Sequence, residues 1–127
     1  MNQQIAHHMS EVPHTIGKDA SLRMAREMMQ EFSYHHLPVL YGGTVVGIVT
    51  ERDLRVAEML KTDEVTGINE VMNDDPLFVE RTTPIKDVLQ LMLKKGYSSV
   101  LVRGTKNEPW GVFTTTDALR LLMVLMD

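Results

Sequence analysis

Two short stretches carry residues that could bind a ligand, and each pairs a threonine with an aspartate three residues later. Thr50 and Asp53 lie in VGIVTERD, and Thr114 and Asp117 lie in WGVFTTTD. A strand that runs into a helix at each stretch would bring hydroxyl, carboxylate and free helix amides together. The carboxylate can accept hydrogen bonds from both hydroxyls of a cis-diol, as in ribose, and the amides and the threonine hydroxyl suit phosphate oxygens.

Both aspartates also fit a purely structural role. Helices are predicted over residues 54–61 and 118–126, directly after Asp53 and Asp117, and aspartate is a favoured residue at the N-cap of a helix. Capping and ligand binding can coexist, so the sequence leaves both interpretations open.

The two stretches belong to an internal repeat. A shift of 63 residues aligns residues 5–40 with residues 68–103 without a gap, and the shift becomes 64 after the next turn. Each copy predicts the order strand, helix, strand, strand, helix. A half of about 60 residues is marginal alone, so we expect the two copies to pack on each other. We therefore predict repeats over residues 1–64 and 65–127, in a mixed α/β (α+β) fold of two pseudo-symmetric β-α-β-β-α units.

Local signals place the elements of each copy. Asp19 or Ser21 can cap a helix over residues 21–32. In the second copy, Thr83 is the expected cap and Pro84 the first helical residue. Two extended segments then form a hairpin in each copy, the first around a two-glycine turn. The last predicted helix is apolar nearly all round, which predicts burial against a partner.

Composition limits the classes of protein to which the chain can belong. The 127 residues are 43% hydrophobic and 24% charged, with a net charge of −4, which is typical of a globular domain and unsuited to binding nucleic acid. No apolar run approaches the roughly 18–20 residues that span a bilayer, and the N-terminus lacks the features of a signal peptide. Cysteine is absent, which excludes disulfides and thiolate chemistry. The expectation is a cytoplasmic protein that contacts neither nucleic acid nor a membrane.

No pattern typical of catalysis or of a metal site is present. The sequence lacks a glycine-rich phosphate loop with lysine, and it contains neither GxSxG nor HExxH. The pairs His7, His8 and His35, His36 are adjacent in sequence, and neighbouring residues on a strand point to opposite faces. We expect surface or interface positions for the first pair, and for His36 either burial in the sheet or contact with an anion. The prediction is a non-enzyme with no metal and no required cofactor.

The order of these motifs resembles a tandem pair of CBS domains, the regulatory unit often called a Bateman module. The resemblance rests on IAHHMSEVP and INEVMNDDP, on YHHLPVL and YSSVLVR, and on the two Thr/Asp stretches. It covers the chain from Ile5 to about Met126. In that family the repeats pack through their sheets and leave two equivalent clefts, which commonly bind adenosine-containing ligands. The resemblance implies AMP, ADP, ATP or S-adenosylmethionine as a regulatory ligand.

The resemblance also implies which residues meet in each cleft, because the Thr/Asp turn of one repeat faces the first strand of the other. The favoured cleft would be lined by Thr15, Ile16, Ala20, His35, His36, Pro38, Thr114, Thr116 and Asp117. The second cleft would be lined by Thr50, Arg52, Asp53, Phe78, Val79, Thr83, Ser98 and Ser99. The first is favoured because TTTD offers three hydroxyls opposite two histidines. In the second, Leu101 stands where the family usually has proline.

Two hypotheses of different classes follow. The leading one is a stand-alone sensor that binds an adenosyl ligand, forms a homodimer through its helices and signals to an unidentified effector protein. The alternative is a ligand-free structural or dimerisation module that recruits a partner through its helices. They differ in whether the Thr/Asp turns serve a ligand or only cap helices.

Overall fold

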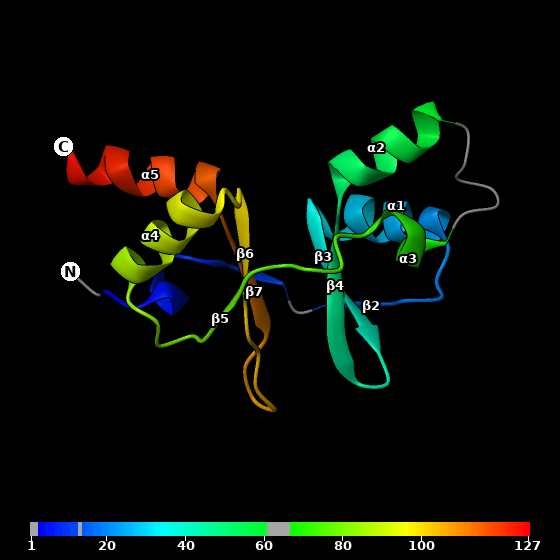
Figure 1. Cartoon of the computed structure of the whole chain (residues 1–127), viewed down its shortest axis with the longest axis horizontal. Helices are drawn as coiled ribbons and strands as arrows, with labels where there is room; N and C mark the ends of the chain where they lie inside the picture. The colour runs from blue at the N-terminus through cyan, green and yellow to red at the C-terminus, as the bar shows by residue number, and fades with distance from the viewer. Residues whose placement is uncertain (1–2, 13, 61–66) are drawn as a thin grey trace. The chain divides into compact units, whose positions relative to one another are not determined.

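A computed structural model of the chain describes residues 3–12, 14–60 and 67–127 (Figure 1). Within them, both copies follow the predicted order of strand, helix, strand, strand, helix. A short helical turn opens each copy, and in the first copy an additional short strand, Ser10–Val12, follows that turn. The mixed α/β fold class with two repeats is therefore confirmed.

The chain forms two compact units that do not coincide with the sequence repeats. Unit 1 joins the N-terminal segment, up to residue 13, to Pro76–Asp127, whereas unit 2 is His14–Asp75. The predicted boundary between the repeats, at residues 64 and 65, lies outside the described residues. The leading segment of repeat 1 thus packs with the body of repeat 2.

Unit 2 is built on a three-stranded sheet in the order β2, β3, β4. Its strands are β2 (Ile16–Gly17), β3 (His36–Tyr41) and β4 (Thr44–Thr50), and its helices are α1 (Leu22–Phe32), α2 (Glu51–Met59) and α3 (Ile68–Val71). The hairpin between β3 and β4 turns at Gly42 and Gly43, whose φ angles of 59° and 79° suit glycine. The predicted two-glycine turn is confirmed.

Unit 1 contains a four-stranded sheet in the order β1, β7, β6, β5. Its strands are β1 (Ser10–Val12), β5 (Phe78–Val79), β6 (Ser99–Val102) and β7 (Trp110–Thr114). Its helices are the 3-10 turn η1 (Ile5–His7), α4 (Ile85–Lys95) and α5 (Thr115–Leu125). Figure 1 shows α4 and α5 on one side of this sheet. The core joins Ile5 of the leading segment to apolar residues of α4, β6 and β7.

The starts of α1 and α4 differ. Ser21 caps α1, because its hydroxyl accepts a hydrogen bond from the Met24 N–H at 3.1 Å. The prediction that Thr83 caps α4 is wrong. Pro84, predicted as the first helical residue, instead occupies the N-cap position with φ −59° and ψ 138°, and α4 begins at Ile85. The Thr83 hydroxyl accepts a hydrogen bond from the Glu80 N–H at 3.1 Å. The threonine side chain therefore closes the turn before the helix.

Equivalent backbone contacts tie each leading segment to the body of the other repeat. In unit 1, Ser10 pairs with Val112 between β1 and β7. In unit 2, Asn73 and Ile48 exchange two backbone hydrogen bonds of 2.9 and 3.0 Å at the corresponding positions. The two leading segments are therefore exchanged between the repeats in the same way. Each one adds backbone pairing to an edge of the sheet that it joins.

A methionine in each leading segment packs against a glycine of the sheet that it joins. A Cβ atom on Gly47 would lie 2.7 Å from Met72 Sδ and 2.7 Å from the Asn73 carbonyl oxygen. A Cβ atom on Gly111 would likewise collide with the end of the Met9 side chain. These contacts explain why glycine precedes the Thr/Asp stretch in both copies.

Candidate functional site

The strand-to-helix corner of unit 2 contains Thr50 and Asp53. The Thr50 N–H donates to Asp53 Oδ2 at 2.9 Å, and the Asp53 N–H donates to Thr50 Oγ1 at 3.1 Å. This reciprocal pair is a capping box. The prediction that Asp53 is the cap is therefore wrong in position: Thr50 is the N-cap, the helix begins at Glu51, and Asp53 is its third residue.

The corner of unit 1 repeats this arrangement at Thr114 and Asp117. The Thr114 N–H donates to Asp117 Oδ2 at 2.9 Å, and the Asp117 N–H donates to Thr114 Oγ1 at 3.3 Å. The Thr114 hydroxyl also lies 3.1 Å from Asp117 Oδ2, to which it can donate. Here too the threonine is the N-cap, because its hydroxyl reaches the amide of the third helical residue.

Each cap uses only one oxygen of the aspartate. Asp53 Oδ1 has no hydrogen-bond partner among the described residues, and Asp117 Oδ1 contacts Arg120 Nη1 at 3.4 Å. Both aspartates are half-buried. Since a carboxylate oxygen can accept further hydrogen bonds, helix capping leaves acceptor capacity for a ligand hydroxyl in both corners.

A cavity of about 430 Å³ adjoins the corner of unit 2. Two predicted site residues, Arg52 and Asp53, lie on its wall, and Glu70 and Val71 of α3 face them. A volume of this size lies within the range of small-molecule sites. The cavity thus gives the unit 2 corner space for part of a ligand, with one cation and two carboxylates beside it.

Two of the remaining predicted residues pair in register with the threonine of a corner. His36 pairs with Thr50 between β3 and β4, and Ser99 pairs with Thr114 between β6 and β7. His36 is half-buried on its strand. Unit 2 also contains Thr15, Ile16, Ala20, His35, Pro38, Arg52 and Asp53, and unit 1 also contains Phe78, Val79, Thr83, Ser98, Thr116 and Asp117. Each predicted cleft therefore takes residues from both units.

The predicted site residues differ in exposure, and most of them are half-buried. Ile16, Pro38 and Val79 are buried, so they can offer a ligand little beyond backbone atoms. The exposed group, which can present its side chains to solvent, consists of His35, Arg52, Ser98 and Thr116. The described side chains include no group of three His, Asp or Glu residues that could hold a metal ion.

Glu51 is a polar residue of the corner that the sequence analysis did not select. Its Oε2 lies 2.5 Å from His35 Nδ1, and its Oε1 lies 3.3 Å from Arg55 Nη1. The hydrogen bond from His35 is the main cause that lowers the pKa of the Glu51 carboxyl below its ordinary value. The Glu51 N–H also donates to the His35 carbonyl at 2.9 Å. Only the hairpin register brings these two residues together, so their spacing in sequence gave no signal.

No helix within the described residues has the length and apolarity needed to cross a bilayer.

Comparisons with known proteins agree with this architecture. A model of the CBS domain family matches residues 4–59 and 68–124. A CBS domain-containing protein of Dictyostelium discoideum is 28% identical over 131 residues, and the alignment covers 94% of this chain and 90% of that protein.

Two solved structures of CBS domain pairs resemble the chain. The CBS domain pair of protein MJ0100, in complex with 5′-methylthioadenosine and S-adenosyl-L-methionine, is 25% identical with a TM-score of 0.76, over 94% of this chain and 98% of that one. CBSX2 of Arabidopsis thaliana, in complex with AMP, is 20% identical with a TM-score of 0.73, over 99% of this chain and 100% of that one.

The two family matches fall on the two copies of the repeat. Both copies contain the same corner, and each contributes one methionine and one glycine to the contacts of the leading segments. The chain therefore belongs to the CBS domain family, as a tandem pair of CBS domains.

Proposed function

We propose that this CBS domain pair is a regulatory module that binds an adenosine-containing ligand in clefts between its two repeats and signals the bound state to a partner protein. The observation that carries the proposal is that the same strand-to-helix corner occurs in both units. In each corner, one oxygen of the aspartate caps the helix, and the other can accept a hydrogen bond from a ribose hydroxyl. Adenosyl ligands bound to MJ0100 and AMP bound to CBSX2 support the same ligand class.

In the favoured cleft, Asp117 would accept hydrogen bonds from the ribose hydroxyls. The Thr114 hydroxyl is already engaged with Asp117, so the exposed Thr116 is the better donor to phosphate. His36 would contribute a second donor from the other repeat. In the second cleft, Asp53 would take the role of Asp117, and Arg52 would contribute the positive charge for a phosphate.

Regulation would follow from differential affinity. A ligand shifts the equilibrium between two arrangements of the repeats only by the difference between its binding free energies for them. A partner protein that contacts one arrangement would then respond to the ligand concentration.

A thermal-shift screen with AMP, ADP, ATP, S-adenosylmethionine and NAD tests the proposal. A ligand present at about 100 times its dissociation constant should stabilise the folded protein by roughly 2.7 kcal/mol. The matched control is the double variant Asp53→Asn with Asp117→Asn, because asparagine keeps an acceptor for the cap and removes the charge. If none of the five compounds raises the melting temperature, the sensing function is wrong.

A second candidate function is a ligand-free module that forms a homodimer or recruits a partner through its helices. The observation that favours it is the surface of α5, which has no buried residue. Its exposed apolar side chains are Leu119, Leu122, Met123, Val124 and Leu125, continued by Met126. A surface of this kind is typical of an interaction site.

A further inference from the structure

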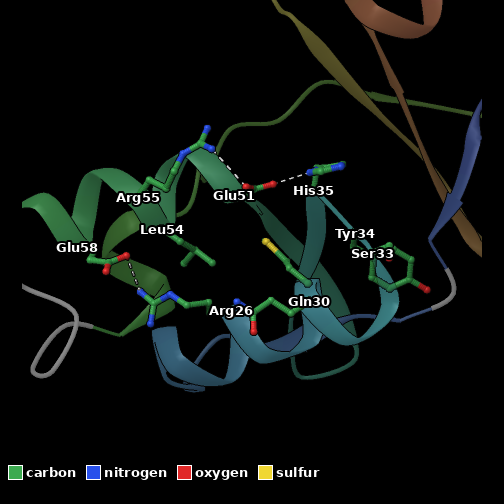
Figure 2. Close-up of a pocket in the computed structure, with 10 residues that line it drawn as sticks. Arg26, Gln30, Ser33, Tyr34, His35, Glu51, Leu54, Arg55 and Glu58 are labelled. Atoms are coloured by element: carbon green, nitrogen blue, oxygen red, sulfur yellow. Dashed lines mark hydrogen bonds and ion pairs between the residues drawn. The ribbon is translucent and has the colours of Figure 1, made fainter.

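Unit 2 contains a second cavity, of about 540 Å³, between helices α1 and α2 (Figure 2). Leu54 and Met29 contribute apolar surface to it, and their side chains are almost fully buried, with exposures of 2% and 5%. Tyr34, at the end that leads into β3, adds an aromatic ring. A cavity of this volume, with apolar surface and polar groups on its rim, has the composition of a small-molecule site.

Charged side chains border this α1–α2 groove in two places. Arg26 of α1 and Glu58 of α2 approach each other across the groove, with 3.7 Å between Nη2 and Oε2. On the other side of Leu54, Glu51 contacts both His35 and Arg55 (Figure 2). Among the described residues, the first border therefore offers Arg26 and Glu58, and the second offers Glu51, Arg55 and the imidazole of His35.

This distribution of charge discriminates between ligand classes. A singly charged anion would be attracted by an arginine but repelled by the neighbouring Glu51 or Glu58. A singly charged cation would be attracted by a glutamate but repelled by Arg26 or Arg55. A molecule that carries both charges can pair each of them with a partner of opposite sign. The contact between Arg26 and Glu58 is longer than a hydrogen bond, so a ligand carboxylate and ammonium can replace it by shorter contacts.

We propose that the α1–α2 groove binds a small zwitterion of the α-amino-acid type with an apolar side chain. The ligand carboxylate pairs with an arginine, its ammonium pairs with Glu58 or Glu51, and its side chain packs on Leu54 and Met29. Gln30 lines the groove, and its side-chain amide makes no hydrogen bond within the part of the chain that the structure describes. It supplies a further polar contact for the ligand.

Titration of the isotope-labelled full chain, followed by nuclear magnetic resonance, tests the proposal with defined probes. The zwitterionic probes are L-leucine, L-methionine and L-phenylalanine, and the singly charged controls are N-acetyl-L-leucine and L-leucinamide. We expect at least one amino acid to shift the amide signals of residues 26–35 and 51–58. Each blocked form of leucine should bind at least about ten-fold more weakly than leucine, because it leaves one charged partner in the groove unpaired. If methionine or phenylalanine is the amino acid that binds, its own N-acetyl and amide forms are the controls.

Variants on the exposed side of α1 locate the site. Gln30→Trp places an indole over the groove and should weaken amino-acid binding at least about ten-fold by steric exclusion. Glu31→Trp is the matched control, because Glu31 is exposed on the same helix and does not line the groove. It should bind the amino acid like the unsubstituted protein.

Three outcomes would overturn the proposal. In the first, none of the three amino acids shifts the signals of the groove. In the second, a blocked form binds as tightly as its parent, so the groove selects a single charge. In the third, amino acids bind but Gln30→Trp and Glu31→Trp weaken binding equally, which places the site elsewhere. None of these results depends on nucleotide binding, because the probes contain no adenosine.

Discussion

The two Thr/Asp corners share one backbone design but differ in the residues that it presents. Both form a capping box with a threonine N-cap and an aspartate as the third helical residue. Between these residues, unit 2 has Glu51 and Arg52, whereas unit 1 has two exposed, uncharged threonines. The comparison teaches that the start of the helix requires the Thr/Asp pair, while the residues between them are free to determine the charge of the site.

The helices that follow the corners also differ. The polar rim of α2 contains Arg55 and Glu58, which border the α1–α2 groove. In contrast, α5 exposes apolar side chains at Leu119 and from Leu122 to its end at Leu125. The same supersecondary unit therefore exposes a charged groove in one copy and an apolar helix in the other.

The largest expected effect concerns this difference between the helices. If α5 forms the contact between two copies of the chain, Leu122→Glu buries an unpaired charge and should reduce the hydrodynamic mass from that of a dimer to that of a monomer. Val56→Glu on α2 is the control, since Val56 is 47% exposed and Leu122 is 53% exposed. Size-exclusion chromatography with light scattering measures the mass. A Leu122→Glu protein with the mass of the unsubstituted chain would exclude α5 as the dimer contact.

The next effect compares the two carboxylates as ligand acceptors. Asp117→Ala should weaken binding of the nucleotide found in the thermal-shift screen by about 10–150-fold, the loss expected for hydrogen bonds to a charged group worth roughly 1.5–3 kcal/mol. Asp53→Ala should have the smaller effect if the favoured cleft is the occupied one. Isothermal titration calorimetry measures both affinities. An unchanged affinity, with a free energy of unfolding lowered by about 1 kcal/mol, would show that Asp117 only caps its helix.

A third comparison concerns the glycines that contact methionine. Gly47→Ala should lower the free energy of unfolding by about 1–3 kcal/mol, because the added methyl group meets the Asn73 carbonyl as well as Met72. Gly111→Ala should cost less than about 1 kcal/mol, since the nearest atoms all belong to the flexible side chain of Met9. Urea denaturation gives both values. Equal losses would mean that the two contacts are equally rigid.

The smallest effect is a dependence of stability on pH in unit 2. The pKa of Glu51 is lowered from its ordinary value of 4.5, so its ionised form stabilises the fold above that value, and this contribution is lost as the pH falls through the lowered pKa. When the pH is lowered from about 6 to about 3, the melting temperature of the unsubstituted protein should fall slightly more than that of the Glu51→Gln variant. The exposed site keeps the difference small, and added salt should reduce it. An identical decrease in both proteins would contradict the prediction.

Local signals in the sequence predicted most of the fold correctly. Ser21 caps α1, and the glycine pair turns the first hairpin. These features depend on neighbouring residues, so spacing and residue type suffice to identify them. Predictions of the cap residue failed at Thr83, Asp53 and Asp117, because several residues near a helix start can accept the same amide hydrogen bonds.

The candidate site was only partly accessible from the sequence. The repeat identified the Thr/Asp corners, and the structure shows the two capping boxes at those residues. Glu51 was missed, because its partner His35 lies 16 residues earlier and becomes a neighbour only through the register of β3 and β4. The joining of residues from both repeats into clefts stays a prediction.

The sequence by itself determined that the chain is a duplicated α/β unit with a Thr/Asp pair at the start of each closing helix. Residue periodicity, turn chemistry and helix capping act over a few positions, and the repeat displays each of them twice. Only the tertiary structure decided that each leading segment packs with the body of the other repeat, and that a charged groove forms between α1 and α2. Those features depend on contacts between residues far apart in the chain, and many pairings of two similar halves satisfy the same local pattern.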